Sequence, residues 1–191
     1  MEILVLCTGN QCRSPFAEAV LRARLAPLGS VTVSSAGSLE GGVAVDERTD
    51  RALRDRGIEP TGQQSRQLTP AMVGDADLVV GMTRQHVREA AVLDHDAFAR
   101  TFTLRELVRR GGRVGPRRAD QSLAEWLAVA GHGRRTSELA GDIGDDDVAD
   151  PIGSRHKDYE RVMDEIEALV DELVCLAWPA GAGTGEQPRG Q

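Results

Sequence analysis

Two residues near the start of the chain, Cys7 and Arg13, have the types and the spacing that phosphoryl transfer uses. Cys7 follows a short apolar run, and Arg13 comes six positions later, where a helical pattern begins. A cysteine beside a guanidinium and a helix N-terminus is stabilised as the nucleophilic thiolate. The planar arginine fork can hold two equatorial oxygens of a transferring phosphoryl group, a geometry that lysine cannot reproduce. The pair therefore predicts attack on phosphorus and a phosphocysteine intermediate.

The segment between these two residues has the composition of an anion-binding loop. Gly9 permits a tight backbone path, and backbone N–H groups at a helix start can surround a tetrahedral oxyanion. Asn10 is expected to hold the loop through side-chain hydrogen bonds, and Ser14 to donate to the Cys7 sulfur as it leaves. The residues expected to bind the substrate phosphate are Thr8, Gly9, Asn10, Gln11, Cys12, Arg13 and Ser14. A tight turn with a buried cysteine and a surface arginine is the alternative interpretation.

Around this loop, strands alternate with helices, which predicts an α/β fold. Short apolar runs predict strands at Glu2–Leu6, Val31–Ser35, Asp77–Met82 and Arg100–Leu104. Helical spacing of apolar residues predicts helices at Ser14–Gly29, Asp46–Arg56, Arg84–Leu93 and Arg155–Trp178, with Ser14 as the first N-cap. We expect an open, twisted, four-stranded parallel sheet with helices on both faces and the phosphate loop at the end of the first strand.

The chain is expected to form one domain over residues 1–178. The segment 111–147 is rich in glycine and arginine and then acidic, which favours an inserted, partly mobile segment with one short helix around Leu123–Val129. Residues 179–191 contain too few apolar side chains to offset their ordering entropy, so this tail is predicted to be disordered.

Composition limits the partners and the compartment. The chain has 30 Asp and Glu against 23 Lys and Arg, which argues against a nucleic-acid partner. No stretch approaches the roughly 18 to 20 apolar residues of a membrane span, and the N-terminus lacks the features of a signal peptide. We therefore expect a cytoplasmic protein with reduced thiols, in which Cys175 is a small buried residue of the last helix. The sequence carries no signal for an oligomeric state.

The longer string CTGNQCRSPFAE, which starts at Cys7, resembles the phosphate loop of the low-molecular-weight protein tyrosine phosphatases. Further matches follow in order at Ser35-Ala36-Gly37, Asp77 to Met82, Thr83 to His86 and Asp150-Pro151. The resemblance spans nearly the whole chain outside 111–147 and the tail. It implies a phosphorylated protein as substrate, foremost phosphotyrosine, and a reaction without a metal or other cofactor.

The same resemblance assigns the general acid and base to Asp150. A leaving oxygen departs more easily when an acid protonates it, and the water of the second step needs a base. Three neighbouring acids, Asp145, Asp146 and Asp147, compete for this role, but they are expected to form a solvated acidic run. Pro151 holds the preceding residue in extended geometry, which favours Asp150. The histidines lack the spacing of metal ligands and are expected on the surface or within helices: His86, His95, His132 and His156.

The chain departs from the family at positions that bear on specificity. Members that act on phosphotyrosine usually have an aliphatic residue at the position of Gln11 and aromatic residues where this chain has Ile152 and Gly153. Members that resemble protein arginine phosphatases have a polar threonine at the position of Gln11. A protein arginine phosphatase and a non-catalytic phosphoresidue binder or redox sensor therefore stay open as alternatives. Cys12 either forms a reversible disulfide with Cys7 or only packs beneath the loop.

Overall fold

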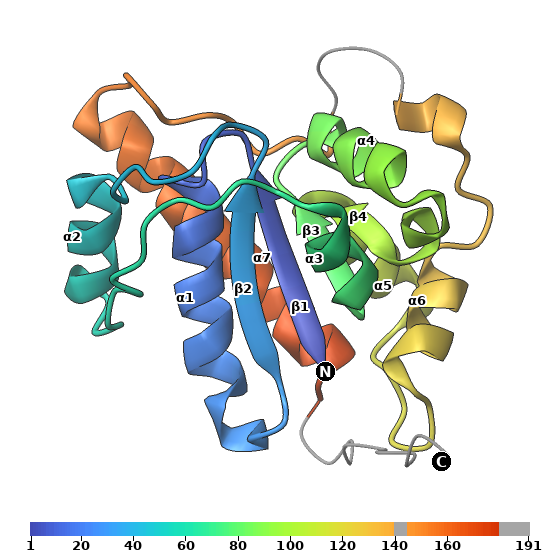
Figure 1. The fold of residues 1–191 in the computed structure, drawn as a ribbon. Helices are drawn as coiled ribbons and strands as arrows, with labels where there is room; N and C mark the ends of the chain where they lie inside the picture. Colours follow the sequence, from blue (N-terminus) through green and yellow to red (C-terminus); the bar gives the residue numbers. More distant parts are fainter. Residues whose placement is uncertain (140–144, 180–191) are drawn as a thin grey trace.

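The centre of the protein is a parallel sheet. The computed structural model describes residues 1–139 and 145–179 (Figure 1). The strands are β1 (Glu2–Cys7), β2 (Thr32–Gly37), β3 (Leu78–Gly81) and β4 (Thr101–Thr103). They pair in the order β2-β1-β3-β4, and each neighbouring pair is parallel, with Val5 of β1 opposite Ser35 and Val80. The predicted four-stranded parallel sheet is confirmed.

Helices cover both faces of this sheet (Figure 1). The α-helices are α1 (Arg13–Leu25), α2 (Glu47–Asp55), α3 (Pro70–Asp75), α4 (Arg84–Leu93), α5 (Leu104–Val114), α6 (Leu123–Ala130) and α7 (His156–Ala177). The short 3₁₀ helices are η1 (Ala26–Leu28), η2 (His95–Arg100) and η3 (Thr136–Leu139). Because side chains of a strand alternate between faces, Ile3 and Val5 join one core with α1, α5 and α7, and Leu4 and Leu6 join another with α3 and α4.

The loops that follow β1 and β3 diverge at the carboxyl edge of the sheet. β1 leads through α1 to its neighbour β2, whereas β3 leads through α4 to β4 on the other side. In open α/β sheets, ligands bind at such a topological switch point. Cys7 is the last residue of β1, and Met82 follows β3 directly. The fold thus places the predicted phosphate loop where a ligand is expected.

Two helices were not predicted from the sequence. Helix α3 begins at Pro70 behind the N-cap Thr69, whose side chain accepts a hydrogen bond from the Met72 N–H. Helix α5 continues through Gly111 into the segment 111–147, and α6 packs against it. A Cβ atom at Gly111 would lie 2.9 Å from the ring of Trp126, so the glycine permits this close approach.

Within the segment 111–147, the expected short helix is present as α6, and its Leu123, Trp126 and Leu127 join the main core. The predicted mobility of the segment is not tested, because residues 140–144 lie outside the described residues. Except for Pro179, the predicted disordered tail lies outside them as well. The domain organisation therefore stays a prediction.

Two local expectations were wrong. Helix α1 begins at Arg13 with Cys12 as its N-cap residue, and the Ser14 side chain is directed to the Cys7 sulfur instead. Cys175 is exposed, whereas Leu173 and Leu176 of the same helix turn their side chains into the core. In the described part of the chain, no helix has the length and apolar character needed to cross a membrane.

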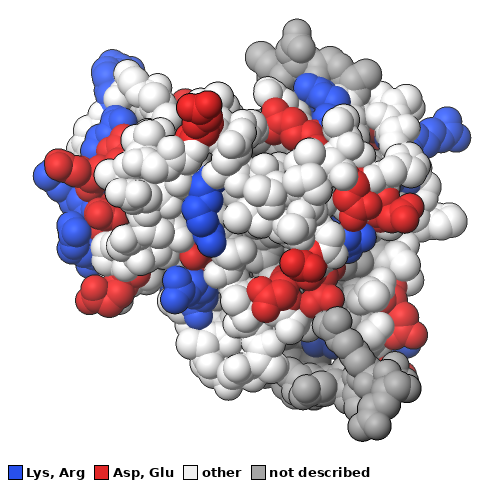
Figure 2. Space-filling model, in the orientation of Figure 1, with Lys and Arg blue, Asp and Glu red and all other residues white. Residues whose placement is uncertain are grey.

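Figure 2 shows acidic and basic side chains side by side on the surface, including over α2, where Arg54 pairs with Asp50.

Candidate active site

The Cys7 sulfur lies at the end of β1, and two hydrogen-bond donors from the loop and the start of α1 point at it. The Asn10 N–H donates to Cys7 Sγ at 3.2 Å, and Ser14 Oγ lies 2.9 Å from it. Because Ser14 Oγ accepts from Asn10 Nδ2, its own proton is free to point at the sulfur. A helix N-terminus adds partial positive charge at the same place. Donors in this arrangement are directed at the sulfur, as the predicted role of Cys7 requires.

The turn of the loop depends on Asn10, which has a left-handed backbone with φ of 50°. This conformation is unfavourable for most residues other than glycine and is found most often for asparagine. The fully buried side chain is held by hydrogen bonds of Nδ2 to Ser14 and Ser35 and of Oδ1 to the Arg66 N–H. Ser35 Oγ in turn donates to the buried carboxylate of Glu18 at 2.7 Å. The network fixes the conformation of Asn10, whose N–H points at the Cys7 sulfur.

Gly37 at the end of β2 allows the loop to lie directly against the neighbouring strand. A Cβ atom at this position would lie 2.6 Å from the Thr8 carbonyl oxygen and 2.8 Å from the Asn10 nitrogen. Glu18, Ser35 and Gly37 were not predicted as functional residues. The string Ser35-Ala36-Gly37 was a family match, but only the paired strands bring it against the loop.

The side chain of Arg13 joins the loop to the segment that carries Asp150. Its Nη1 donates to the Val148 carbonyl oxygen at 3.1 Å, and its Nη2 lies 2.9 Å from Asp150 Oδ2. Arg13 is buried, whereas the Asp150 side chain is 48% exposed. The structure therefore brings the guanidinium of Arg13 and the carboxylate of Asp150 together, although Asp150 lies 137 positions along the chain from Arg13. Both adjoin the loop that begins at Cys7, since Arg13 is the first residue of α1.

Cys12 has a different environment from Cys7. Its sulfur is buried and donates to Asp46 Oδ2 at 3.6 Å. Burial raises the pKa of the Cys12 thiol to about 11, and hydrogen bonds from Arg48 lower the pKa of Asp46. Cys12 is therefore a protonated donor at neutral pH, which makes it unsuited to nucleophilic attack. A reversible Cys7–Cys12 disulfide stays a prediction.

The backbone of Gln11 is held by the residues at the start of α2, and its side chain lies over Gly9 of the loop. The Gln11 carbonyl oxygen accepts from the Asp46 N–H at 2.9 Å and from Thr49 Oγ1 at 3.3 Å. A Cβ atom at Gly9 would lie 3.5 Å from Gln11 Nε2, so the amide covers that glycine. A polar group thus lies at the outer surface of the phosphate loop.

Two aliphatic side chains flank the site. Leu39 is 57% exposed, and its N–H donates to the Thr8 carbonyl oxygen. Ile152 is 54% exposed, and its N–H donates to Asp150 Oδ1 at 3.1 Å. Each backbone is therefore tied to a residue of the site while the side chain stays available to a substrate.

His86 connects the loop after β3 to the phosphate loop, although the sequence analysis assigned it no such contact. Its Nδ1 accepts from the Thr83 N–H at 3.0 Å, so the proton of the neutral ring lies on Nε2, which then donates to Thr8 Oγ1 at 3.1 Å. Burial, together with the charges of Arg13 and Arg88, lowers the pKa of His86 to about 3. The spacing Thr83 to His86 is that of a capping box, which was the available signal.

The burial of neutral His86 predicts a pH-dependent stability. The unfolded chain takes up a proton near pH 6.5 and the folded chain only near pH 3, so acid favours unfolding between these values. The free energy of unfolding is expected to fall by up to about 1.4 kcal/mol per pH unit from this group. Urea unfolding between pH 7 and pH 4.5 should show a shallower pH slope for His86→Gln than for the wild type. The exposed His132 supplies the control His132→Gln, and equal slopes in all three proteins would refute the prediction.

In residues 1–139 and 145–179, no group of three or more His, Cys, Asp and Glu side chains is arranged to hold a metal ion.

Comparison with known proteins assigns the family. The family model described as low molecular weight phosphotyrosine protein phosphatase matches residues 2–114, which include the whole phosphate loop. The chain belongs to this family of enzymes. Asp150 lies beyond the matched residues.

The individual relatives carry two kinds of name. A protein-arginine-phosphatase from Geobacillus stearothermophilus is 31% identical over 90% of this chain and 92% of its own length. A low molecular weight protein-tyrosine-phosphatase from Streptomyces coelicolor is 30% identical over 91% of both chains. The solved structure of the arginine phosphatase from Geobacillus stearothermophilus has a TM-score of 0.65 and 29% identity, and it covers 90% of this chain and 89% of its own.

Proposed function

We propose that this protein is a cytoplasmic, cysteine-dependent protein tyrosine phosphatase with Cys7 as nucleophile. The observation that carries the proposal is the pair of donors at Cys7 Sγ, the Asn10 N–H and Ser14 Oγ, near the N-terminus of α1. Arg13, at the end of the same loop, forms an ion pair with Asp150. Such a constellation supplies a nucleophile, an oxyanion clamp and a proton carrier for the hydrolysis of a phosphomonoester.

The reaction has two steps in this proposal. Cys7 Sγ attacks phosphorus, the bond from phosphorus to the substrate oxygen breaks, and the carboxyl of Asp150 gives its proton to that oxygen. The backbone N–H groups of residues 8–14 and the guanidinium of Arg13 hold the three other phosphoryl oxygens. A water molecule then attacks the phosphocysteine, Asp150 takes its proton, and Ser14 donates to the departing sulfur.

The substrate group is proposed to be phosphotyrosine because the exposed side chains of Leu39 and Ile152 flank the site. Apolar side chains favour contact with an aromatic ring over contact with water. Phosphoarginine is the second candidate, since the amide of Gln11 lies over the loop and can accept from a guanidino group.

The test is hydrolysis of one peptide in two forms, with phosphotyrosine and with phosphoarginine, by freshly reduced protein in the presence of EDTA. We expect turnover of both measured as phosphate release, with the larger kcat/KM for the phosphotyrosine peptide. A larger kcat/KM for phosphoarginine would favour the second candidate. If neither peptide is hydrolysed, the enzyme proposal fails and a phosphoresidue-binding or redox-sensing role replaces it.

A further inference from the structure

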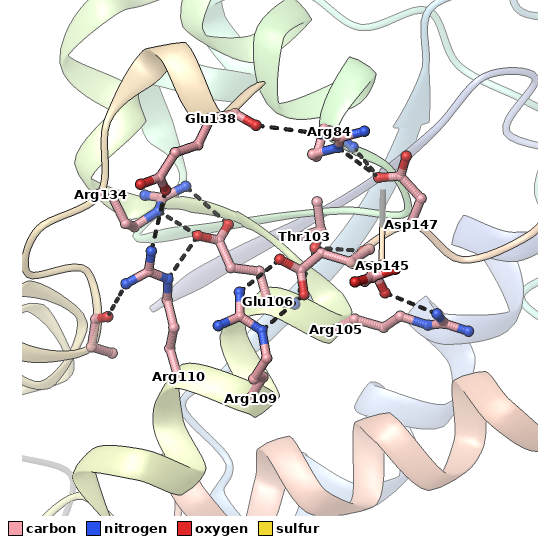
Figure 3. Close-up of polar contacts among 12 residues, drawn as sticks. Arg84, Thr103, Arg105, Glu106, Arg109, Arg110, Arg134, Glu138, Asp145 and Asp147 are labelled. Carbon is pink, nitrogen blue, oxygen red and sulfur yellow. Dashed lines mark hydrogen bonds and ion pairs between the residues drawn. The ribbon is translucent and has the colours of Figure 1, made fainter. Parts of the chain in front are cut away.

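The acidic residues 145–147, which precede Asp150, are bound to the fold through their backbone or their side chains (Figure 3). At the backbone, the Asp145 carbonyl oxygen accepts from Arg105 Nη1 at 3.0 Å, and the Asp146 carbonyl oxygen accepts from Thr103 Oγ1 at 2.8 Å. Thr103 is the last residue of β4 and is fully buried, and Arg105 lies in the first turn of α5. The expectation of a solvated acidic run is therefore wrong for Asp146 and Asp147, whereas the side chain of Asp145 is exposed.

The side chains of Asp146 and Asp147 are held as well. The carboxylate of Asp146 accepts from Arg109 Nε at 3.0 Å and from Arg109 Nη2 at 2.7 Å, which is a bidentate pair. Asp147 Oδ1 accepts from the Arg84 N–H at 2.7 Å, at the first residue of α4. The Asp147 side chain is 12% exposed, and its carboxylate also lies 3.7 Å from the guanidinium of Arg84.

The bound segment ends at the active site. Val148 is buried, its N–H donates to the Met82 carbonyl oxygen at 2.8 Å, and its own carbonyl oxygen accepts from Arg13. Asp150 follows two residues later. We call residues 145–148 the anchored segment. The anchored segment contacts α4 and α5 at its start and the Arg13 guanidinium, which also contacts Asp150, at its end.

We propose that Asp146 with Arg109, and Asp147 with Arg84, are positioning residues for the general acid Asp150, an inference that rests on the proposed function. Asp150 itself is half exposed, and among the described residues its ion-pair partner is the Arg13 side chain, which must also serve the substrate. A general acid acts within hydrogen-bond reach of the leaving oxygen, and a misplacement of about 1 Å can cost 10²-fold in rate. The two ion pairs hold the anchored segment in place and thereby set the position of Asp150 relative to that oxygen.

The test compares two substrates that need the acid to different degrees. The nitrophenolate of p-nitrophenyl phosphate leaves readily without a proton, whereas the phenolate of phenyl phosphate needs one. The variants are Asp146→Ala, Arg109→Gln and Asp147→Ala, and kcat/KM is measured because it reports the steps up to departure of the leaving group. We expect kcat/KM to fall by about tenfold on phenyl phosphate and by less than about threefold on p-nitrophenyl phosphate. The tenfold loss is a part of the 10²-fold or more that general acid catalysis supplies.

The dependence on Asp150 is tested in a double-mutant cycle. In the Asp150→Ala background, Asp146→Ala is expected to change kcat/KM for phenyl phosphate by less than about twofold, because the group that it positions is absent. The exchanged pair Arg109→Asp with Asp146→Arg is expected to recover part of the loss. Thermal unfolding is measured for each variant, and any variant that fails to fold is excluded from the comparison. The variants that fold then test the proposal.

The matched control is Arg110→Gln, which removes an arginine from the same helix. Arg110 pairs with Glu106 and Glu138, and not with the anchored segment. It should leave the ratio of the two substrates unchanged. Equal losses on both substrates, or an undiminished loss in the Asp150→Ala background, would overturn the positioning role. Failure of the proposed function is distinguishable, since the wild type would then hydrolyse neither substrate.

Discussion

Replacement of Cys7 by serine is expected to lower kcat for the phosphotyrosine peptide by about 10⁴-fold or more, the scale of loss seen when a catalytic nucleophile is removed. The serine hydroxyl is not ionised at neutral pH, so the donors from Asn10 and Ser14 have no anion to stabilise. The reaction loses its nucleophile while the loop keeps its shape. Phosphate release with and without the substitution measures the effect.

The chain offers a matched control for this substitution in Cys175, which is exposed on α7. The variant Cys175→Ser changes the same atom at a place remote from the loop and should keep the wild-type kcat. Acid quenching of the wild type during turnover should trap phosphate on Cys7. If Cys7→Ser keeps more than about one hundredth of the activity, a fraction far above what nucleophile removal leaves, another residue is the nucleophile.

The sheet and its order of elements could be predicted because the signals are local. Each strand is a short buried apolar run, such as Leu78–Gly81, and burial on both faces leaves little room for polar residues. Helix α5 was missed because Gly111 and Gly112 weaken its helical signal. The reason for Gly111 is the ring of Trp126, which reaches it from a different helix. A contact of this kind is invisible in the spacing of residues.

In the candidate site, too, the local features could be predicted from the sequence and the contacts between distant segments could not. Cys7, Arg13 and the loop between them occupy seven consecutive positions, so the strand end, the turn and the helix start can all be predicted from the sequence. Asp150 came from the family resemblance, and the sheet is required to bring it to Arg13. The role of His86 depends on the switch point between β1 and β3, which sets its ring against Thr8. Pairings across the sheet cannot be read from one strand alone.

The acidic run shows how composition misleads at a functional site. Three consecutive aspartates usually indicate a solvated surface, because isolated charges avoid burial. Here Arg84 and Arg109, from helices far away in the sequence, supply the partners of Asp147 and Asp146. The abundance of arginine in 84–110 was the available signal, but its pairing with this run requires the fold.

The Arg13→Lys variant is expected to lose about 10³-fold in kcat/KM, the scale on which a guanidinium that clamps a phosphoryl group contributes. Lysine keeps the charge but has one ammonium in place of the fork that reaches both Val148 and Asp150. Because the clamp acts chiefly on the transition state, kcat should fall more than KM rises. Arg24→Lys is the control on the same helix, since Arg24 pairs with surface carboxylates of α7. The comparison requires that wild type and variant have equal thermal unfolding midpoints. If kcat/KM of Arg13→Lys is then within about tenfold of the wild type, the loss is smaller than removal of an oxyanion donor causes. Such a result would show that charge alone suffices and that the fork has no role.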